Sequence, residues 1–231
     1  MNALRVTGLT VTRGAGPVIR DVDVTLEPGR ITALVGPNGA GKTSLLEAIS
    51  GVVPASAGTV HIGTSEITKQ SRVARARRGL AHIEQGRAVF GGLTVLENLM
   101  LTARIRARAD ELFELFPELE KRRDSPAALL SGGEQQMVVL ARAFAARPSF
   151  LLIDEMSLGL APVVFTRLLP LVTRFAEEGA AILLVEQFTH LALGVASDAL
   201  VVSSGRVTYA GGAQDLLDSP STLHSAYLGE S

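Results

Sequence analysis

The sequence predicts an α/β fold with a mostly parallel sheet, and three features of the chain support this prediction. Short apolar runs with strand character alternate with helical segments, which is the pattern of a parallel sheet with crossover helices. A glycine-rich turn at 36–43 connects one apolar run to a helical segment. From about 94 to 146 the pattern is helical throughout, so we expect a helical subdomain inserted between the strands of the sheet.

The strands are predicted from two kinds of pattern. Val22, Val24 and Leu26 alternate with polar residues, which is typical of a half-buried strand. The continuous apolar run 31–35 is typical of a strand that is buried on both faces. Further strands are predicted at 58–62, 79–83, 150–154 and 181–185.

The helices are predicted from apolar periodicity and from their end signals. The first should end at Gly51, because glycine commonly terminates helices. The helix beginning near 94 opens with a capping box, in which Thr94 caps the first turn and Glu97 bonds back to it. Helices are predicted at 43–50, 71–78, 94–109, 111–116, 133–146 and 162–178, and short helix and strand elements close the chain.

The composition excludes several classes of site. The 231 residues include no cysteine, which rules out disulfides, thiolate metal sites and cysteine nucleophiles, and fits the cytosol. The 22 basic and 23 acidic residues give a net charge of −1, so we expect no nucleic-acid partner. The apolar runs, such as 180–185, are too short to cross a bilayer, and the first residues lack the pattern of a signal peptide. A membrane role would therefore depend on a partner.

Residues 36–43 spell GPNGAGKT, which matches the phosphate-binding pattern G-x-x-x-x-G-K-[ST]. The glycines let backbone N–H groups curl around phosphate oxygens, and the following helix N-terminus adds its positive dipole end. Lys42 is expected to reach the outer phosphates, and the Thr43 hydroxyl is a candidate ligand of Mg²⁺. The residues expected to hold the nucleotide are Gly36, Pro37, Asn38, Gly39, Ala40, Gly41, Lys42, Thr43 and Ser44.

Two carboxylates end the apolar run LLIDE at 151–155. Ligands of parallel sheets bind at the carboxyl ends of the strands, so both side chains should lie beside the phosphate-binding loop. Asp154 is expected to hold Mg²⁺, directly or through water. Glu155 is expected to polarise the attacking water as a general base.

The segment LSGGEQQ at 130–136 also has the composition of a helix start. Ser131, Gly132 and Gly133 would leave free N–H groups at the positive end of the helix dipole, which favours a phosphate. An ordinary N-cap is the alternative, with Ser131 capping the helix and Glu134 completing a capping box.

With these motifs in this order, essentially the whole chain resembles the ATP-binding cassette (ABC) family, whose signature is LSGGQ. The resemblance implies a single domain over 1–231, with an ATP-binding core at 1–85 and 147–231, an antiparallel β subdomain at its N-terminal end, and a helical signature subdomain at 86–146. It implies ATP and Mg²⁺ as ligands. It also implies a second ATPase subunit, identical or homologous, whose bound nucleotide is covered by Ser131 and its glycines.

The resemblance assigns further roles. Gln85 falls at the position of the glutamine that senses Mg²⁺ and the permease, and SLGLA at 157–161 at the position of the D-loop. The strings DEMSLGLAP, VEQ at 185–187 and EQGRAVFGGLTVLENL at 84–99 are similar to the ATPase subunits of branched-chain amino acid importers and their urea or amide relatives.

The chain departs from the family pattern at two positions. Gln187 stands where the family usually has a histidine that contacts the γ-phosphate; an amide can donate a hydrogen bond but carries no charge. His190, three residues later, is expected to be an ordinary surface histidine. Arg13 stands where the family has an aromatic residue that stacks on adenine, and no Phe, Tyr or Trp precedes Phe90.

Two other groups have less specific interpretations. The basic run of Arg72, Arg75, Arg77 and Arg78 is expected to be a solvated helix face, because no aromatic residues interleave it. The apolar residues Val89, Phe90 and Leu93 fit either a core position or a surface that meets a permease helix.

We therefore expect an ATPase that drives amino-acid-type import, in contact with permease subunits at the inner face of the membrane and indirectly with a substrate-binding protein. An exporter ATPase or a soluble ABC ATPase outside transport remains the alternative. A catalytically silent ATP-binding module is disfavoured because Lys42, Asp154 and Glu155 are all present.

Overall fold

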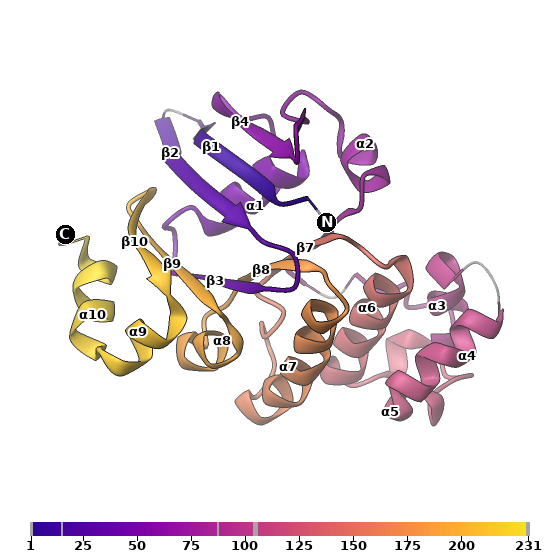
Figure 1. The fold of residues 1–231 in the computed structure, drawn as a ribbon. Helices are drawn as coiled ribbons and strands as arrows, with labels where there is room; N and C mark the ends of the chain where they lie inside the picture. Colours follow the sequence, from indigo (N-terminus) through magenta and orange to yellow (C-terminus); the bar gives the residue numbers. More distant parts are fainter. Residues whose placement is uncertain (1, 15, 87, 104–105, 230–231) are drawn as a thin grey trace.

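The computed structural model describes residues 2–14, 16–86, 88–103 and 106–229. A six-stranded sheet runs through the middle of the molecule in Figure 1, in the order β10-β9-β3-β8-β7-β6. All its neighbouring strands are parallel except β10, which is antiparallel to β9. Its strands are β3 Ile31–Val35, β6 Leu80–Ile83, β7 Phe150–Asp154, β8 Ala181–Val185, β9 Asp198–Ser203 and β10 Arg206–Gly212.

A second sheet is antiparallel and contains the N-terminal strands, in the order β2-β1-β4-β5. It lies above the six-stranded sheet in Figure 1. Its strands are β1 Leu4–Arg13, β2 Gly16–Leu26, β4 Ala57–Ile62 and β5 Ser65–Glu66. The predicted mostly parallel sheet and N-terminal antiparallel subdomain are therefore both confirmed.

Helices cover both faces of the six-stranded sheet (Figure 1). The helix α1, which follows the phosphate-binding motif, lies on the side of the antiparallel sheet, and α6, α7 and α8 lie on the other side. The helices outside the insertion are α1 Lys42–Ser50, α2 Arg72–Arg77, α7 Pro162–Glu177, α8 Thr189–Val195, α9 Ala213–Asp218 and α10 Pro220–Leu228. Among the described residues, none of these or the remaining helices is long and apolar enough to span a membrane.

The chain between β6 and β7 is helical, as predicted. It contains α3 Val95–Ala103, α4 Arg106–Leu115, α5 Pro117–Glu120, a 3-10 helix at Ala127–Leu129, and α6 Gly132–Ala146. Thr94 and Glu97 form the predicted capping box, with a 2.8 Å bond from the Thr94 N–H to Glu97 and a 3.2 Å bond from the Glu97 N–H to Thr94. Residues 104–105 of the helix predicted at 94–109 lie outside the described residues.

The core consists of two apolar layers, one on each face of the six-stranded sheet. In β8, Ile182 and Leu184 belong to the layer that includes α6 and α7, whereas Leu183 and Val185 belong to the layer of α1 and the antiparallel sheet. A strand that is apolar on both faces has no polar alternation. This is why the continuous apolar runs at 31–35, 150–154 and 181–185 form the centre of the sheet.

The prediction of a fully solvated basic face on α2 is wrong for one residue. Arg75 is only 2% exposed, and its guanidinium donates to the carbonyls of Ala48 and Ile49 at 2.6 Å each. It also donates to the carbonyls of Thr68 and Gln70. Arg75 thus donates to carbonyl groups at the C-terminal end of α1, where the last carbonyls of a helix lack the regular N–H partner four residues on.

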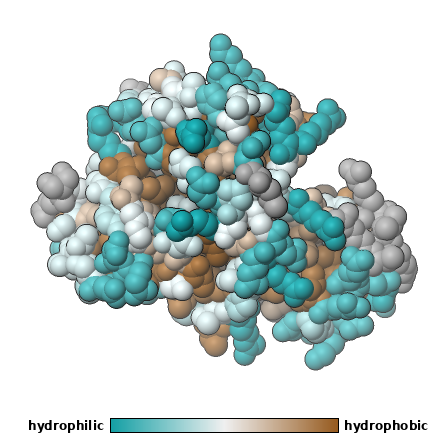
Figure 2. Space-filling model, in the orientation of Figure 1, coloured by the Kyte–Doolittle hydropathy of each residue, from teal (hydrophilic) through white to brown (hydrophobic). Residues whose placement is uncertain are grey.

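The surface is otherwise mixed. Figure 2 shows hydrophilic residues over much of one face, with hydrophobic areas between them. Phe90, which the sequence left between core and surface, is 52% exposed, whereas Val89 packs partly buried against the core. His190 is exposed on α8, as predicted.

Candidate functional site

The phosphate-binding motif forms a loop between β3 and α1. Gly36, Gly39 and Gly41 have φ values of 146°, 79° and 103°, which L-residues with side chains rarely adopt. A Cβ on Gly41 would lie 2.5 Å from the carbonyl oxygen of Val18, so the backbone of β2 also approaches too closely for a side chain. The backbone conformation therefore favours glycine at all three positions, and at Gly41 the close approach of β2 also excludes a side chain.

Lys42 begins α1 and is 5% exposed. Its ammonium donates to the carbonyls of Gly36 at 2.8 Å and Pro37 at 3.0 Å, so the side chain lies across the loop. Burial lowers the pKa of Lys42, while the charges of Glu155 and Asp154 raise it. The cation thus contacts the loop directly and feels the charges of Asp154, the last residue of β7, and Glu155, the residue after it.

The last residue of β7, Asp154, is 1% exposed, and its Oδ1 has no hydrogen-bond partner among the described residues. Burial raises the pKa of Asp154 to about 6, against a hydrogen bond from the Thr43 hydroxyl and the charge of Lys42. A buried, unpaired carboxylate oxygen next to a hydroxyl is the donor set that a hard divalent cation prefers. Asp154 and Thr43 thus fit the predicted Mg²⁺ ligands.

Three neighbouring strands bring the predicted catalytic side chains together. Gln85 follows β6, Glu155 follows β7 and Gln187 follows β8. Oε2 of Glu155 accepts hydrogen bonds from Nε2 of Gln85 at 2.9 Å and Nε2 of Gln187 at 3.3 Å. Glu155 itself has a φ of 45°, which is uncommon for a residue with a side chain and is typical of functional sites. Its N–H is fixed by a 2.9 Å bond to the carbonyl of Val185.

These groups surround one cavity of about 390 Å³, a size typical of small-ligand sites. Motif residues form one side, and the three catalytic candidates form the other. Val18 of β2 completes the wall and was missed, because an apolar residue in a strand gives no signal of a site. The cavity is lined by Val18, Asn38, Gly39, Gly41, Lys42, Thr43, Ser44, Gln85, Glu155 and Gln187.

Some predicted site residues do not line this cavity in the described part of the chain. They are Gly36, Pro37, Ala40 and Asp154, which adjoin lining residues in the sequence, and two groups from elsewhere, Arg13 and the turn at Ser131. Arg13 lies at the end of β1, and its guanidinium is paired with Glu47 of α1. Ser131 caps α6 and forms a complete capping box with Glu134, so the ordinary N-cap interpretation holds. The capping box is compatible with phosphate binding by the same turn, because Ser131 is exposed and the remaining N–H groups of the turn are at a helix N-terminus.

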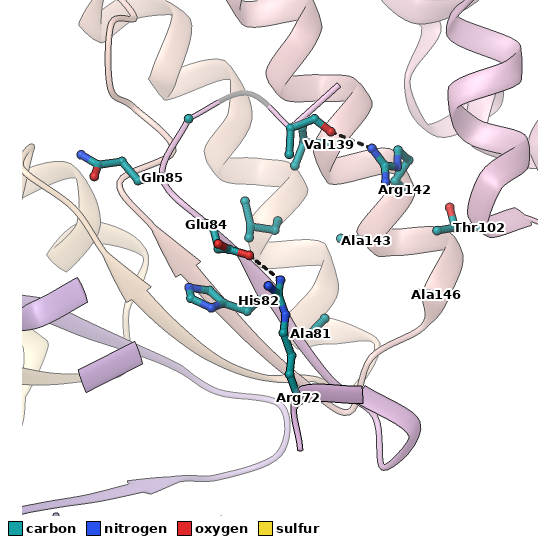
Figure 3. A pocket seen from close by; sticks show the side chains of 13 residues that line it. Arg72, Ala81, His82, Glu84, Gln85, Thr102, Val139, Arg142, Ala143 and Ala146 are labelled. Carbon is teal, nitrogen blue, oxygen red and sulfur yellow. Dashed lines mark hydrogen bonds and ion pairs between the residues drawn. The ribbon is translucent and has the colours of Figure 1, made fainter. Parts of the chain in front are cut away.

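A second hollow, of about 540 Å³, lies on the other side of Gln85 (Figure 3). Glu84 and Arg72 form an ion pair in it, and Arg142 of α6 donates to the carbonyl of Ala88 at 2.7 Å. The guanidinium of Arg142 also lies 5.2 Å from the centroid of the Phe90 ring. The segment after Gln85 is therefore tied to the helix that begins at Ser131.

The comparisons with known proteins decide the family. The protein-family model that is described as "ABC transporter" matches residues 19–157 of the chain. The chain belongs to the ABC transporter family. It is 36% identical to the high-affinity branched-chain amino acid transport ATP-binding protein BraG of Pseudomonas aeruginosa, over 91% of this chain and 93% of the relative. It is also 36% identical to the lipopolysaccharide export system ATP-binding protein LptB of Escherichia coli K12, over 92% and 91%.

The fold agrees with solved structures of the family. A crystal structure of the ADP conformation of an ATP-binding cassette of an ABC transporter superposes with a TM-score of 0.86 over 100% of both chains, at 23% identity. This ABC protein is an ATP-binding transporter subunit and an ATPase, as predicted from its motifs.

Proposed function

We propose that this ABC ATPase hydrolyses MgATP in the cavity beside Gly36–Thr43 and uses the reaction to energise import of a branched-chain amino acid or a related amide. The observation that carries the catalytic part is the pair of amides on one oxygen of Glu155. Gln85 and Gln187 fix Oε2 from two different strands, so Oε1 is the oxygen left to accept a proton. A positioned carboxylate of this kind is suited to general-base chemistry.

The phosphate groups of ATP would be held by the loop. The left-handed conformation of the loop glycines would let N–H groups between Gly36 and Thr43 donate to phosphate oxygens, and Lys42 would supply the positive charge. Thr43, Asp154 and Gln85 would hold Mg²⁺, which neutralises charge on the phosphates. The support is the unpaired buried oxygen of Asp154 beside the Thr43 hydroxyl.

In the hydrolytic step, water attacks the γ-phosphorus as the bond to the β,γ-bridging oxygen breaks. Glu155 takes the proton of the water, and the products are ADP and phosphate. Gln187 would donate a neutral hydrogen bond to the γ-phosphate in place of the family's histidine. Deprotonation by a general base contributes about 10²–10⁴-fold to such rates.

The family's mode of action would place Ser131, Gly132 and Gly133 over the nucleotide of a second ATPase subunit. The hollow beyond Gln85 is a candidate contact for permease subunits, because it connects the catalytic glutamine to α6 through Arg142 (Figure 3). Phe90 is exposed at this place and would take part. The subunit would then lie at the inner face of the cell membrane, attached through the permease.

Support for import comes from BraG and from a probable branched-chain amino acid transport protein LivF of Archaeoglobus fulgidus, 36% identical over 87% of this chain. The exporter alternative rests on LptB, which is equally similar by identity. The strings DEMSLGLAP and VEQ, which resemble the importer branch, favour import.

Uptake measurements separate the alternatives. A strain lacking the gene should take up radiolabelled leucine or short-chain amides more slowly, and wild-type protein, but not Glu155→Gln, should restore the rate. Purified wild-type protein should release phosphate from MgATP in parallel. Unchanged uptake of all these substrates, with phosphate release intact, would contradict import and favour the exporter alternative.

A further inference from the structure

Glu186 is a buried carboxylate that the hydrolytic step does not use. It follows β8 directly, between Val185 and Gln187, and is 1% exposed. Burial raises the pKa of Glu186 to about 7, against hydrogen bonds from Ser157 and from the backbone of Gln187. Burying a carboxylate is costly unless it is fully hydrogen-bonded. The hydrogen-bond partners of Glu186 therefore show which parts of the chain it connects.

Both oxygens of Glu186 accept from one residue. The Ser157 N–H donates to Oε1 at 3.2 Å, and the Ser157 hydroxyl donates to Oε2. Ser157 is itself 4% exposed. Together with the Gln187 N–H, three donors converge on one carboxylate. A leucine would occupy a similar volume and accept none of these hydrogen bonds, whereas a glutamine could still pair with the Ser157 hydroxyl by donating to it.

Ser157 opens the turn that leads from the catalytic strand into α7. The Leu158 N–H bonds to the carbonyl of Glu155 at 3.0 Å, and the Leu160 N–H bonds to the carbonyl of Ser157 at 2.9 Å. The turn is thus continuous with the general-base residue on one side. On the other side it ends at Pro162, the first residue of α7.

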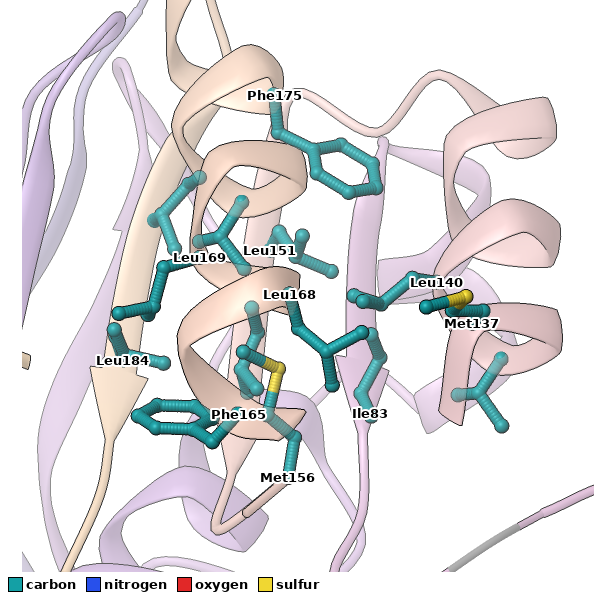
Figure 4. Close-up of a cluster of buried hydrophobic side chains, with 14 of the residues drawn as sticks. Ile83, Met137, Leu140, Leu151, Met156, Phe165, Leu168, Leu169, Phe175 and Leu184 are labelled. Carbon is teal, nitrogen blue, oxygen red and sulfur yellow. The ribbon is translucent and has the colours of Figure 1, made fainter. Parts of the chain in front are cut away.

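The helix α7 packs against the core and contacts the first turn of α6. Figure 4 shows Phe165, Leu168 and Leu169 pointing from α7 into the core beside Met156 and Leu184. A Cβ on Gly133 would lie 2.6 Å from Cγ1 of Val164, so α6 approaches α7 at the second glycine of the signature.

We propose that Glu186 is a positioning residue for ATP hydrolysis: by holding Ser157, it fixes the turn 157–161 between the Glu155–Gln187 site and the signature end of α6. This inference rests on the proposed function. Glu186 contacts two adjacent loops. Gln187, its neighbour in sequence, belongs to the loop after β8, and Ser157, its hydrogen-bond partner, belongs to the loop after β7. Loss of the contact should therefore misplace catalytic groups without removing the phosphate-binding loop.

The test is a double-mutant cycle of Ser157→Ala and Glu186→Leu, with steady-state phosphate release as the readout. Each single variant should lower kcat about 5- to 20-fold and leave KM for ATP within about twofold. The double variant should be no slower than the slower single variant, because both changes remove the same contact. Thr166→Ala, which removes an exposed hydroxyl that bonds to Pro162 on the same helix, is the matched control and should keep wild-type kcat.

Single variants with wild-type kcat, or two losses that multiply in the double variant, would overturn the positioning role. A rise in KM with unchanged kcat would also overturn it, since that would place Glu186 in ATP binding. If Glu186→Leu does not fold, Ser157→Ala alone decides by the same split between kcat and KM. Wild-type protein without any turnover would instead count against the proposed function, which keeps the two failures distinct.

Discussion

Nε2 of Gln85 donates a 2.9 Å hydrogen bond to Oε2 of Glu155, across 70 residues of sequence. The contact joins two parts of the molecule that the chain separates by the entire helical insertion. Gln85 also borders the hollow that contains Arg142 of α6 (Figure 3). A movement of the helical region would therefore reach Glu155, the proposed general base, through a single side chain.

The first prediction concerns Glu155→Gln. The amide cannot take the proton of the water, so turnover should fall about 10²–10⁴-fold, while ATP still binds through Lys42 and the loop. Steady-state phosphate release and nucleotide titration measure the two quantities. Glu178→Gln neutralises a glutamate at the end of α7, far along the chain from the motif, and should leave both unchanged. Near wild-type turnover in Glu155→Gln would show that another group acts as the base.

The second prediction concerns Lys42→Ala. This change removes the buried ammonium that crosses the loop, so tight ATP binding should be lost. Calorimetry with ATP measures the affinity. Lys69→Ala removes an exposed lysine and serves as the control. If Lys42→Ala bound ATP with wild-type affinity, the assignment of the phosphate site would have to be abandoned.

The third prediction concerns pH and Asp154. Its pKa is raised from 3.8 to about 6, so the folded protein holds this proton more tightly than the unfolded chain does. The free energy of unfolding should therefore fall as pH rises from about 4 to 6 and stay lower above that range. Asp154→Asn should remove this penalty and stabilise the protein at pH 8 without added metal, by up to about 3 kcal/mol.

Urea denaturation at pH 5 and pH 8 checks this expectation. The advantage of Asp154→Asn over wild type should shrink at the lower pH, and Mg²⁺ with ATP should stabilise the wild type more than the variant. A variant that is less stable than wild type at pH 8 would mean that the charge of Asp154 is already compensated, by Lys42 above all.

The sequence was sufficient for the motif-bearing elements because their signals are local. The buried strands 31–35, 150–154 and 181–185 are apolar apart from Thr32 and Asp154, and GPNGAGKT fixes the turn between strand and helix. Since the carboxyl ends of parallel strands meet at one edge, Glu155 could be placed beside the loop from the strands alone, whereas Gln85 and Gln187 were assigned through the resemblance to the family.

Contacts between distant residues could not be predicted in this way. Neither Val18 nor Glu186 belongs to a sequence motif with a defined spacing, and the contacts of both depend on which strands are neighbours. Arg75 lies in a basic run that is exposed at its other positions, so composition alone placed it on the surface. Its burial depends on the carbonyl groups at the end of α1, which become partners only when α1 and α2 are packed together.

The fourth prediction concerns Arg75. Arg75→Met should lower the free energy of unfolding by at least about 2 kcal/mol, because it leaves buried carbonyl groups without donors. Arg75→Lys should recover only part of this loss. A single ammonium cannot reproduce a planar guanidinium that donates to carbonyls at the end of α1 and in the segment before α2. Arg77→Met, an exposed position on the same helix, should change stability little. Equal urea midpoints for Arg75→Met and Arg77→Met would contradict the capping role.

The last prediction concerns Arg13, where the family has an aromatic residue. The guanidinium is paired with Glu47, and the pair is partly exposed, with 44% and 21% of the two side chains accessible. Exposed pairs of this kind contribute about 0–1 kcal/mol, so the pair does not prevent the guanidinium from lying against an adenine ring.

Stacking of a base on an aromatic side chain contributes about 1–3 kcal/mol, against about 0.5–1 kcal/mol for an exposed cation–π contact. Arg13→Tyr should therefore tighten ATP binding by about 1 kcal/mol and leave the affinity for tripolyphosphate unchanged, because only the base would gain a contact. Glu47→Gln is the control for loss of the ion pair, and it should shift both affinities equally if at all. Titrations in which Arg13→Tyr binds ATP no more tightly than wild type would mean that position 13 does not face the base, and that other groups hold the adenine.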